Sequence, residues 1–264
     1  VIGSDEVFNC IQKNSNVGYS TELFGKDNHA DRLITYAASF GNTTLEKLEK
    51  YQKANEVGNL LKEFDAISVR DANSGSIVER LTGEEPVYNL DPVLTYDYMN
   101  CCDRIPQIKA AEKYLILYAY AGRISNDEAD WIAEYAKKKN LKVYAIGGIQ
   151  KCADRFIDCS PFEVLAYFRN AEEVITDTFH GSIFSVITHR PFTTLIRKSV
   201  GNSYGNEEKL SDLLNRLGLA ERMTTKVEDT ERINRQPIDY EKVDDVLQKQ
   251  REIAKKYLQN NIEG

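Results

Sequence analysis

The chain has 264 residues, of which 42% are hydrophobic and 28% are charged, and its formal net charge at pH 7 is −7. These values are typical of a folded globular protein with one large or two mid-sized domains, and they exclude a disordered chain. Lysine and arginine are scattered along the sequence, so the basic patch of a nucleic-acid-binding protein is missing. An anionic substrate would therefore need local cations.

The five cysteines form no C-x-x-C pair, and the three histidines follow no zinc-binding spacing. We therefore expect reduced, structural thiols and no metal site. The apolar runs are too short to span a bilayer and no secretory segment opens the chain, so the expected location is the cytoplasm. Because the chain begins with Val1, at what looks like the end of a strand, we also expect a truncated N-terminus.

The first hundred residues alternate short apolar runs with helical patterns, which indicates βα units and a mainly parallel sheet. Strands are predicted at residues 33–38, 66–70 and 87–90, and helices at 45–61 and 76–81. Thr43 and Glu46 suggest a capping box for the first helix. The proline of Asp91-Pro92 ends the last strand.

Residues 95–108 lack periodicity and are the predicted interdomain linker. A second α/β alternation follows, with strands predicted at 114–119, 141–146, 173–176 and 192–195, and helices at 126–138, from 161 and over 181–187. Ser125 with Glu128, and Ser160 with Glu163, are expected capping boxes. We therefore predict two domains, 1–100 and 101–238, and a long amphipathic C-terminal helix, 239–264, that could pack back across them.

His180 is the most distinctive candidate for chemistry. It follows a predicted strand, precedes a glycine and stands at the start of a helix, whose free N–H groups favour an anion. A histidine there handles a carboxylate or phosphate, or is simply held by a local hydrogen bond. Asp177 could orient its imidazole and Ser182 could donate to an anion, or both could cap the helix.

Gly3-Ser4-Asp5 offers close backbone approach, a donor and an acceptor after the first strand, although an ordinary turn explains it equally well. Arg70 ends a predicted strand, where it could clamp an anion or pair with a neighbouring acid. Asp91 more often begins an Asp-Pro turn than binds a ligand. The motifs of serine hydrolases, P-loop kinases and zinc proteases are absent, which excludes those classes.

Five segments, in order, resemble the sequence blocks of polysaccharide pyruvyl transferases. They are residues 1–9 (VIGSDEVFN), 34–41 (ITYAASFG), 67–70 (ISVR), 91–92 (DP) and 176–181 (TDTFHG). The resemblance extends to about Arg222. Two features depart from the family pattern: Phe8 stands where the family usually has tryptophan, and the glycine- and asparagine-bearing loop that precedes Gly3 in the family is not present.

The resemblance implies a GT-B-like pair of Rossmann-like domains. It also implies phosphoenolpyruvate as donor substrate, a sugar or lipid-linked oligosaccharide of a cell-surface polysaccharide as acceptor, a pyruvate ketal as product and no cofactor. A membrane-bound acceptor would make the association with the membrane peripheral. The expected catalytic residues are His180, as general acid or phosphate binder, and Arg70. The expected substrate-binding residues are Ser4, Asp5, Asp177, Gly181 and Ser182.

Two alternatives stay open. One is a GT-B glycosyltransferase with a nucleotide-sugar donor, because architecture alone does not choose the donor. The other is a non-catalytic homologue that acts as a binding or assembly protein.

Overall fold

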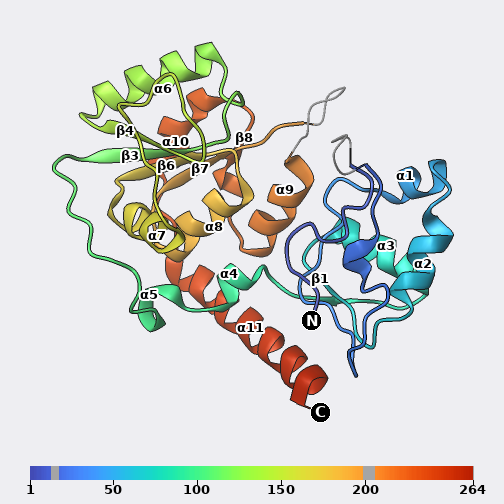
Figure 1. Cartoon of the computed structure of the whole chain (residues 1–264). Helices are drawn as coiled ribbons and strands as arrows, with labels where there is room; N and C mark the ends of the chain where they lie inside the picture. Colours follow the sequence, from blue (N-terminus) through green and yellow to red (C-terminus); the bar gives the residue numbers. More distant parts are fainter. Residues whose placement is uncertain (13–17, 199–205, 264) are drawn as a thin grey trace. The chain divides into compact units, whose positions relative to one another are not determined.

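The computed structural model describes residues 1–12, 18–198 and 206–263. The chain forms two compact units, drawn in Figure 1: the first contains Val1–Tyr96 and Asp245–Gly264, and the second contains Asp97–Asp244. The predicted linker at 95–108 crosses the division between them, and helices α4 (Pro92–Thr95) and α5 (Tyr98–Cys101) lie on either side of it. The domain boundaries near residues 100 and 238 stay predictions.

The second unit is built on a parallel sheet of six strands. In chain order they are β3 (Tyr114–Tyr118), β4 (Lys142–Ile146), β5 (Arg155–Phe156), β6 (Glu173–Thr176), β7 (Phe192–Leu195) and β8 (Met223–Thr224). Their spatial order is β5-β4-β3-β6-β7-β8, which is the order of a Rossmann fold. The direction of winding reverses between β3 and β6. In such sheets the ligand crevice lies beyond the carboxyl ends of the strands at this reversal.

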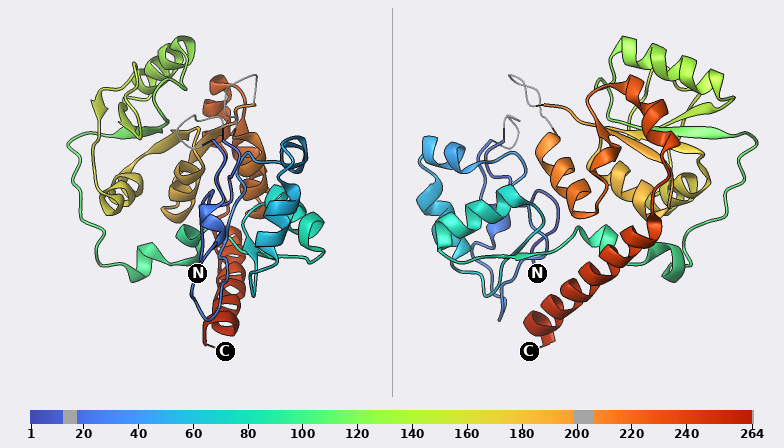
Figure 2. Two further views of the ribbon diagram at one scale, coloured as in Figure 1. Left: turned by 45° about the vertical axis from the view of Figure 1, so that its right-hand side comes forward. Right: turned by 180° about the vertical axis from the view of Figure 1, so that it is seen from behind.

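Helices cover both faces of this sheet (Figures 1 and 2). On one face lie α6 (Asn126–Lys138) and α10 (Thr230–Arg235); on the other lie α7 (Pro161–Asn170) and α8 (Phe179–Ile187); α9 (Glu207–Arg216) follows β7 in the chain. The strand β3 serves both faces: Leu117 packs in one cluster with Ile132 of α6, whereas Tyr118 stacks on Phe184 of α8. Burial on both faces explains why this strand is an uninterrupted apolar run.

Local sequence signals predicted this unit well. The four predicted strands are confirmed to within a residue, and the capping boxes of α6 and α7 form as expected. Helix α8 begins at Phe179, two residues before its predicted start, because Thr178 accepts a hydrogen bond from the Gly181 N–H and caps it. The two-residue strands β5 and β8 were not predicted, since so short a strand has no periodicity.

Four parallel segments form the centre of the first unit. Ile2 bridges Thr35, the segment from Ile34 to Ala38 bridges the one from Ala66 to Val69, and β1 (Ser68–Val69) pairs with β2 (Val87–Tyr88). The predicted continuous strand at 33–38 is wrong, because Ala37 has a left-handed φ of 49° that interrupts it. Its N–H bonds the Ser68 hydroxyl at 3.1 Å in place of a strand carbonyl.

The helical region at 45–61 is two helices, α1 (Leu45–Lys50) and α2 (Ala54–Leu61), so the single predicted helix is also wrong. Gln52 between them has a φ of 56°, which a continuous helix cannot contain. The cap of α1 is Thr44 rather than Thr43. Helix α3 (Ala72–Thr82) begins at the capping carboxylate of Asp71, four residues before its predicted start.

Aromatic side chains fill the core of the first unit. Phe8 is fully buried, stacks on Phe24 at a centroid distance of 4.4 Å and lies 5.3 Å from Phe40. The position where the family usually has tryptophan is therefore a packing position, which phenylalanine fills without a hydrogen bond.

The long C-terminal helix α11 (Tyr240–Leu258) is confirmed, and its last turns pack on the first unit. Ala254 and Tyr257 share a buried cluster with Ile34 and Tyr36, and the Tyr257 hydroxyl donates to the Thr35 carbonyl at 2.7 Å. The helix thus supplies the apolar contact that its sequence pattern requires. The predicted α/β class with mainly parallel sheets is also confirmed.

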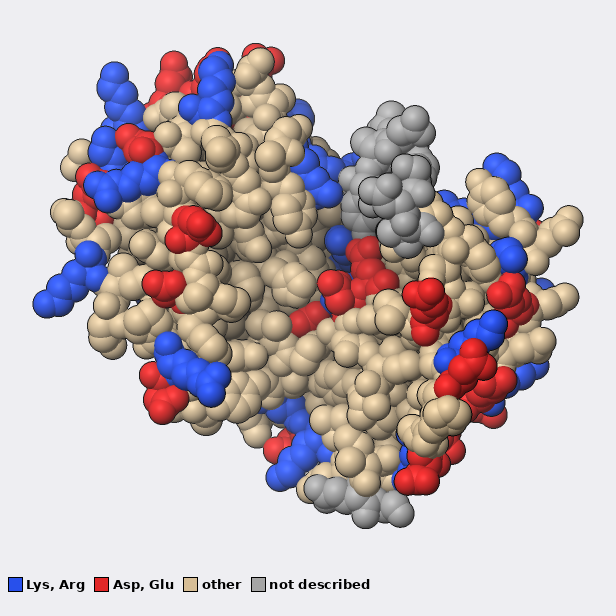
Figure 3. Space-filling model, viewed as in Figure 1, with Lys and Arg blue, Asp and Glu red and all other residues tan. Residues whose placement is uncertain are grey.

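Charges of both signs are mixed on the surface of the described residues. On the face drawn in Figure 3, lysine and arginine side chains of the described residues lie among aspartate and glutamate side chains and form no continuous patch. Within the described ranges, no helix combines the length and the apolar character needed to cross a membrane.

Candidate functional site

Three charged residues follow strands of the second unit at its carboxyl edge. Asp177 directly follows β6, Arg123 lies in the loop after β3, and Arg197 comes two residues after β7. The strands β3 and β6 flank the reversal of winding, so these side chains lie where a Rossmann sheet binds its ligand.

Asp177 is a buried carboxylate with few partners. Its side chain is 0% exposed, and neither carboxylate oxygen has a hydrogen-bond partner among the described residues. The nearest cation is Arg123, whose Nη1 lies 3.6 Å from Asp177 Oδ2. Burial raises the pKa of Asp177, and the positive charges of Arg123 and Arg197 offset this only in part. Within the described residues, Asp177 therefore accepts no hydrogen bond from the His180 imidazole that would orient the ring, and the cap of α8 is Thr178 rather than Asp177.

The guanidinium of Arg197 uses only some of its hydrogen-bond donors in the described part of the chain. Its Nη1 donates to Glu128 Oε1 at 2.7 Å, whereas its Nε and Nη2 are buried without a hydrogen-bond partner in the described part of the chain. Burial raises the pKa of Glu128, but the bonds from Arg197 and from the Ser125 backbone prevail and lower it, so the pair is ionic. Buried polar atoms without partners are rare, and a ligand that completes them is one explanation.

Asn206 fixes the backbone around these charges. Its side chain accepts from the Arg197 N–H at 2.6 Å and donates to the Asp177 carbonyl at 2.6 Å and to the Leu195 carbonyl at 3.2 Å. These bonds tie the end of β7 to the residue that follows β6. The positions of Asp177 and Arg197 are therefore set by one buried amide.

His180 occupies the first turn of α8, next to Asp177 in the sequence and half-buried. Its ring contacts the rings of Phe179 and Phe184, with centroids 5.6 and 6.0 Å away. Because α8 points its N-terminus at the same edge, the partial positive charge of the helix adds to the two arginines.

Gly181 and Ser182 serve the packing of α8. A Cβ on Gly181 would lie 2.1 Å from the Thr176 hydroxyl, so only glycine lets the helix come this close to β6. The fully buried Ser182 hydroxyl lies 2.9 Å from the Thr194 hydroxyl and donates to the Thr178 carbonyl at 3.2 Å. The substrate-binding roles predicted for both residues stay predictions.

A glycine also shapes the loops beside Arg123. A Cβ on Gly148, which follows β4, would lie 2.3 Å from the Ala121 backbone nitrogen. Gln150 reinforces the contact by donating to the Ala119 carbonyl at 3.0 Å. The pair Gly147-Gly148 thus holds the loop that carries Arg123.

The first unit has its own charged cluster at the carboxyl ends of its parallel segments. The guanidinium of Arg70, which follows β1, donates to Asp91 Oδ2 and to Asp5 Oδ1, both at 2.8 Å. Burial lowers the pKa of Arg70, but the carboxylates of Asp91 and Asp5 outweigh this and raise it. The other Asp91 oxygen accepts from the Val93 N–H and caps α4, as expected for an Asp-Pro turn.

Gly3 and Ser4 position Asp5. A Cβ on Gly3 would lie 2.2 Å from the Tyr36 carbonyl oxygen, and the φ of Gly3 is +128°, so the turn requires glycine. Ser4 is half-buried in this turn. The Asp5 side chain is 69% exposed although Arg70, its partner, is only 3% exposed. The cluster therefore presents one accessible carboxylate on a buried cation.

The predicted site residues thus fall into two groups, one in each unit: Ser4, Asp5 and Arg70, and Asp177, His180, Gly181 and Ser182. The sequence did not reveal Arg123, Arg197, Glu128 and Asn206. Arg123 and Arg197 follow predicted strand ends, as Arg70 does, and this shared position is the signal that could have identified them.

Comparison with solved structures finds distant similarities. An O-GlcNAc transferase mutant from Thermobaculum terrenum is 15% identical with a TM-score of 0.36, over 75% of this chain and 41% of that chain. The glycotransferase of kitacinnamycin is 12% identical with a TM-score of 0.47, over 79% and 57%. A putative UDP-N-acetylglucosamine 2-epimerase from Listeria monocytogenes is 10% identical with a TM-score of 0.43, over 85% and 66%. These TM-scores are too low to assign a common fold, and this chain spans about half the length of the first two.

Comparison with curated proteins finds no match. Comparison with protein families gives a clear result, because residues 1–199 match the family described as polysaccharide pyruvyl transferase. The matched part contains both charged clusters up to Arg197. The chain belongs to the polysaccharide pyruvyl transferase family.

Proposed function

We propose that this chain transfers a pyruvyl group from phosphoenolpyruvate to hydroxyl groups of a saccharide and forms a pyruvate ketal, without a cofactor. The observation that carries the proposal is the cluster of Asp177, Arg123 and Arg197, with unsatisfied buried atoms, at the winding reversal of a Rossmann sheet. The family match supports the same reaction class.

The donor is a small dianion or trianion, so its site must supply positive charge and hydrogen-bond donors. Arg123 and Arg197 supply two guanidinium groups, and the first turn of α8 supplies the positive end of a helix. The Asp177 carboxylate lies 3.6 Å from Arg123 and offsets part of this positive charge when it is ionised. We assign the phosphate and carboxylate of the donor to this edge of the second unit.

The reaction requires a proton and two oxygen nucleophiles. Protonation of the donor's methylene carbon makes the adjacent carbon electrophilic, and a first sugar hydroxyl adds to it and gives up its proton. A second hydroxyl then displaces phosphate, which leaves with the carbon–oxygen bonding pair and takes up the proton of that hydroxyl, and the ketal closes. We assign the protonation to His180, because an imidazole is the side chain best suited to proton transfer near neutral pH.

Arg70 has its charge compensated by Asp5 and Asp91, so we assign it a positioning function rather than direct contact with the donor. It holds the exposed carboxylate of Asp5, which is able to accept a hydrogen bond from an acceptor hydroxyl. Removing the Arg70 guanidinium would leave the buried Asp91 carboxylate without its cation.

The proposal is tested by measuring phosphate release from phosphoenolpyruvate with a panel of galactose, mannosamine and glucuronate glycosides. We expect release that depends on at least one acceptor, and phosphoenolpyruvate should raise the melting temperature of the protein. If no acceptor promotes release, and UDP-sugars raise the melting temperature where phosphoenolpyruvate does not, a nucleotide-sugar transferase replaces the proposal.

Substitution of His180 distinguishes a role in proton transfer from a role in phosphate binding. His180→Asn keeps a hydrogen-bond donor but cannot supply a proton, so we expect kcat to fall by about 100-fold or more with a smaller change in KM for the donor. Steady-state kinetics over a range of pH measures this. A rise in KM alone would show instead that His180 only binds phosphate.

A further inference from the structure

The first unit contains a pocket of about 560 Å³ that none of the assigned residues lines. Its lining residues are Ile11, Gln12, Gly18, Tyr19, Lys47, Lys50, Tyr51 and Lys53. Three of these described residues are lysines, two are tyrosines and none is acidic. In a chain with a net charge of −7, a pocket of this composition offers local positive charge and apolar surface together.

Two segments form the walls of this pocket, which we call the lysine–tyrosine pocket. One consists of residues 11–12 and 18–19, where Ile11 pairs with Tyr19 and the Gln12 N–H donates to the Gly18 carbonyl at 2.9 Å. The other is α1 with the turn that follows it. Both segments leave the carboxyl ends of parallel segments of the first unit, the edge that also carries Asp5 and Arg70.

Lys50 is the lysine of this pocket whose charge no described carboxylate compensates. Lys53 pairs with Glu56 at 3.1 Å, and its Nζ lies 4.2 Å from the centroid of the Tyr19 ring. The Lys47 Nζ donates to the Asn42 carbonyl. Lys50 forms no ion pair with a described residue, and its Nζ lies 5.7 Å from the centroid of the Tyr51 ring.

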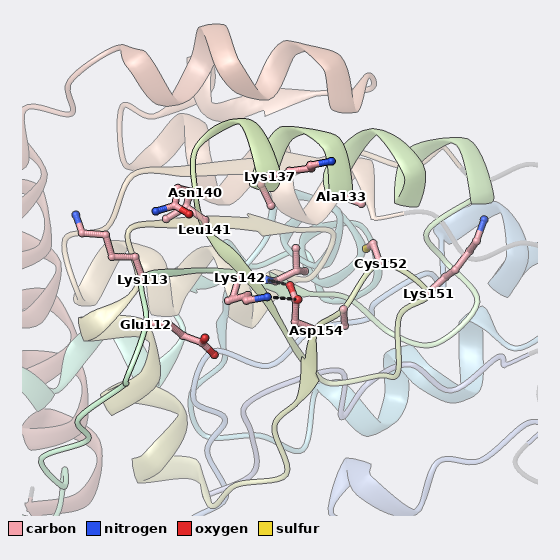
Figure 4. A pocket seen from close by; sticks show the side chains of 13 residues that line it. Glu112, Lys113, Ala133, Lys137, Asn140, Leu141, Lys142, Lys151, Cys152 and Asp154 are labelled. Atoms are coloured by element: carbon pink, nitrogen blue, oxygen red, sulfur yellow. Dashed lines mark hydrogen bonds and ion pairs between the residues drawn. The ribbon is translucent and has the colours of Figure 1, made fainter.

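A pocket in the second unit provides a contrast (Figure 4). It has about 700 Å³, lies between α6 and the strand β4, and is also rich in lysine. There, however, Lys142 pairs with Asp154 at 2.9 Å, and Lys151 pairs with Asp130 at 2.9 Å. Glu112 and Asp154 line that pocket as well. Its carboxylates make it a poor anion site, whereas the described residues that line the lysine–tyrosine pocket include no carboxylate, and Glu56 reaches only Lys53.

We infer that the lysine–tyrosine pocket binds a sugar phosphate as a part of the acceptor. Lysine ammonium groups act as point charges that suit phosphate, whereas planar carboxylates are usually held by the fork of an arginine. The rings of Tyr19 and Tyr51 and the side chain of Ile11 offer apolar surface to the C–H face of a sugar ring. The assignment to the acceptor rests on the proposed function; the binding itself does not.

Calorimetric titration of the chain with glucose 1-phosphate tests this inference, with inorganic phosphate, methyl glucoside and glucuronate as the other ligands. We expect glucose 1-phosphate to bind more tightly than each of these three. Lys50→Gln should weaken its binding about fivefold, as the loss of one partly exposed charge contact does. Tyr51→Ala should weaken it similarly. Both side chains are exposed, and circular dichroism confirms that the variants fold.

The matched control is Lys137→Gln, which removes a lysine from the second-unit pocket and should leave the affinity unchanged. Absence of saturable binding, or equal affinity of wild type and Lys50→Gln, would overturn the inference. Tighter binding of glucuronate than of glucose 1-phosphate would overturn the assignment to phosphate.

The titration and the phosphate-release assay distinguish a failure of the pocket assignment from a failure of the proposed function. If the chain releases phosphate from phosphoenolpyruvate while Lys50→Gln binds glucose 1-phosphate like wild type, the pocket assignment fails and the proposed function stands. If binding depends on Lys50 but no acceptor promotes phosphate release, the proposed function fails and the pocket assignment stands.

Discussion

Asp177 shows at the level of one residue how the candidate site differs from an ordinary surface. Its buried carboxylate has no hydrogen bond to a described residue, and its nearest cation is 3.6 Å away. A group in this state costs folding free energy, so its presence is explained if a ligand or a neighbouring charge uses it. The cost is measurable through its dependence on pH.

The raised pKa of Asp177 predicts the sign of that dependence. A raised folded-state pKa means that the folded protein binds this proton more tightly than the unfolded chain. The resulting stability is present below the ordinary carboxyl pKa of about 4 and is lost as the pH rises through the folded pKa. We therefore expect the free energy of unfolding of wild type, relative to Asp177→Asn, to fall as the pH rises from about 4 to 7.

Urea unfolding of both proteins without ligand measures this difference. A difference that stays constant over the pH range would show that Asp177 is not perturbed. Activity gives a second readout, because Asp177→Asn should lose turnover even where it gains stability, as residues at strained functional sites often do.

Gly181 allows α8 to pack closely on β6. A Cβ there would lie 2.1 Å from the Thr176 hydroxyl, so Gly181→Ala should lower the free energy of unfolding by about 1–3 kcal/mol. Gly58→Ala in α2 is the matched control: its Cβ would lie 3.3 Å from the Leu81 carbonyl oxygen, and the helix propensity of alanine offsets that contact. Chemical denaturation should give a clearly larger loss for Gly181→Ala. Equal losses would refute the packing account.

At the level of helices and strands, the sequence predicted correctly those features that depend on residues close together in the chain. Ser125 and Ser160 identified two helix starts because a capping box involves residues three apart. The break between α1 and α2 could not be predicted, since nothing in the sequence indicates that Gln52 adopts a left-handed conformation. The interruption at Ala37 depends on the Ser68 hydroxyl, 31 residues away, which a local pattern cannot contain.

A buried hydrogen bond anchors the C-terminal helix α11. Tyr257→Phe in α11 removes a buried hydrogen bond of 2.7 Å and leaves the Thr35 carbonyl without this donor, so we expect a loss of about 1–2 kcal/mol in the free energy of unfolding. Tyr51→Phe, at an exposed position, should change it by less than about 0.5 kcal/mol. Thermal unfolding of the two variants compares them. If Tyr257→Phe is as stable as wild type, α11 does not anchor through this bond.

At the scale of the whole molecule, the sequence predicted the α/β class and the parallel sheets but not the strand order of the second unit. Pairing of β3 with β6 joins residues far apart in the chain, and a sequence pattern gives the strands without their neighbours. For the same reason, the sequence did not reveal the charged cluster of the second unit. Arg123, Asp177 and Arg197 come together only because the winding reverses between β3 and β6.

The family match and the two charged clusters together define the central claim, which is that the second unit binds phosphoenolpyruvate through Arg197 and its neighbours for transfer to a saccharide. The most direct test is the rate of acceptor-dependent phosphate release from phosphoenolpyruvate by wild type, Arg197→Gln and the control Lys137→Gln. We predict that wild type and Lys137→Gln release phosphate at the same rate and that Arg197→Gln is slower by about 100-fold. Release that needs no acceptor, or that is equally fast in Arg197→Gln, would contradict the account.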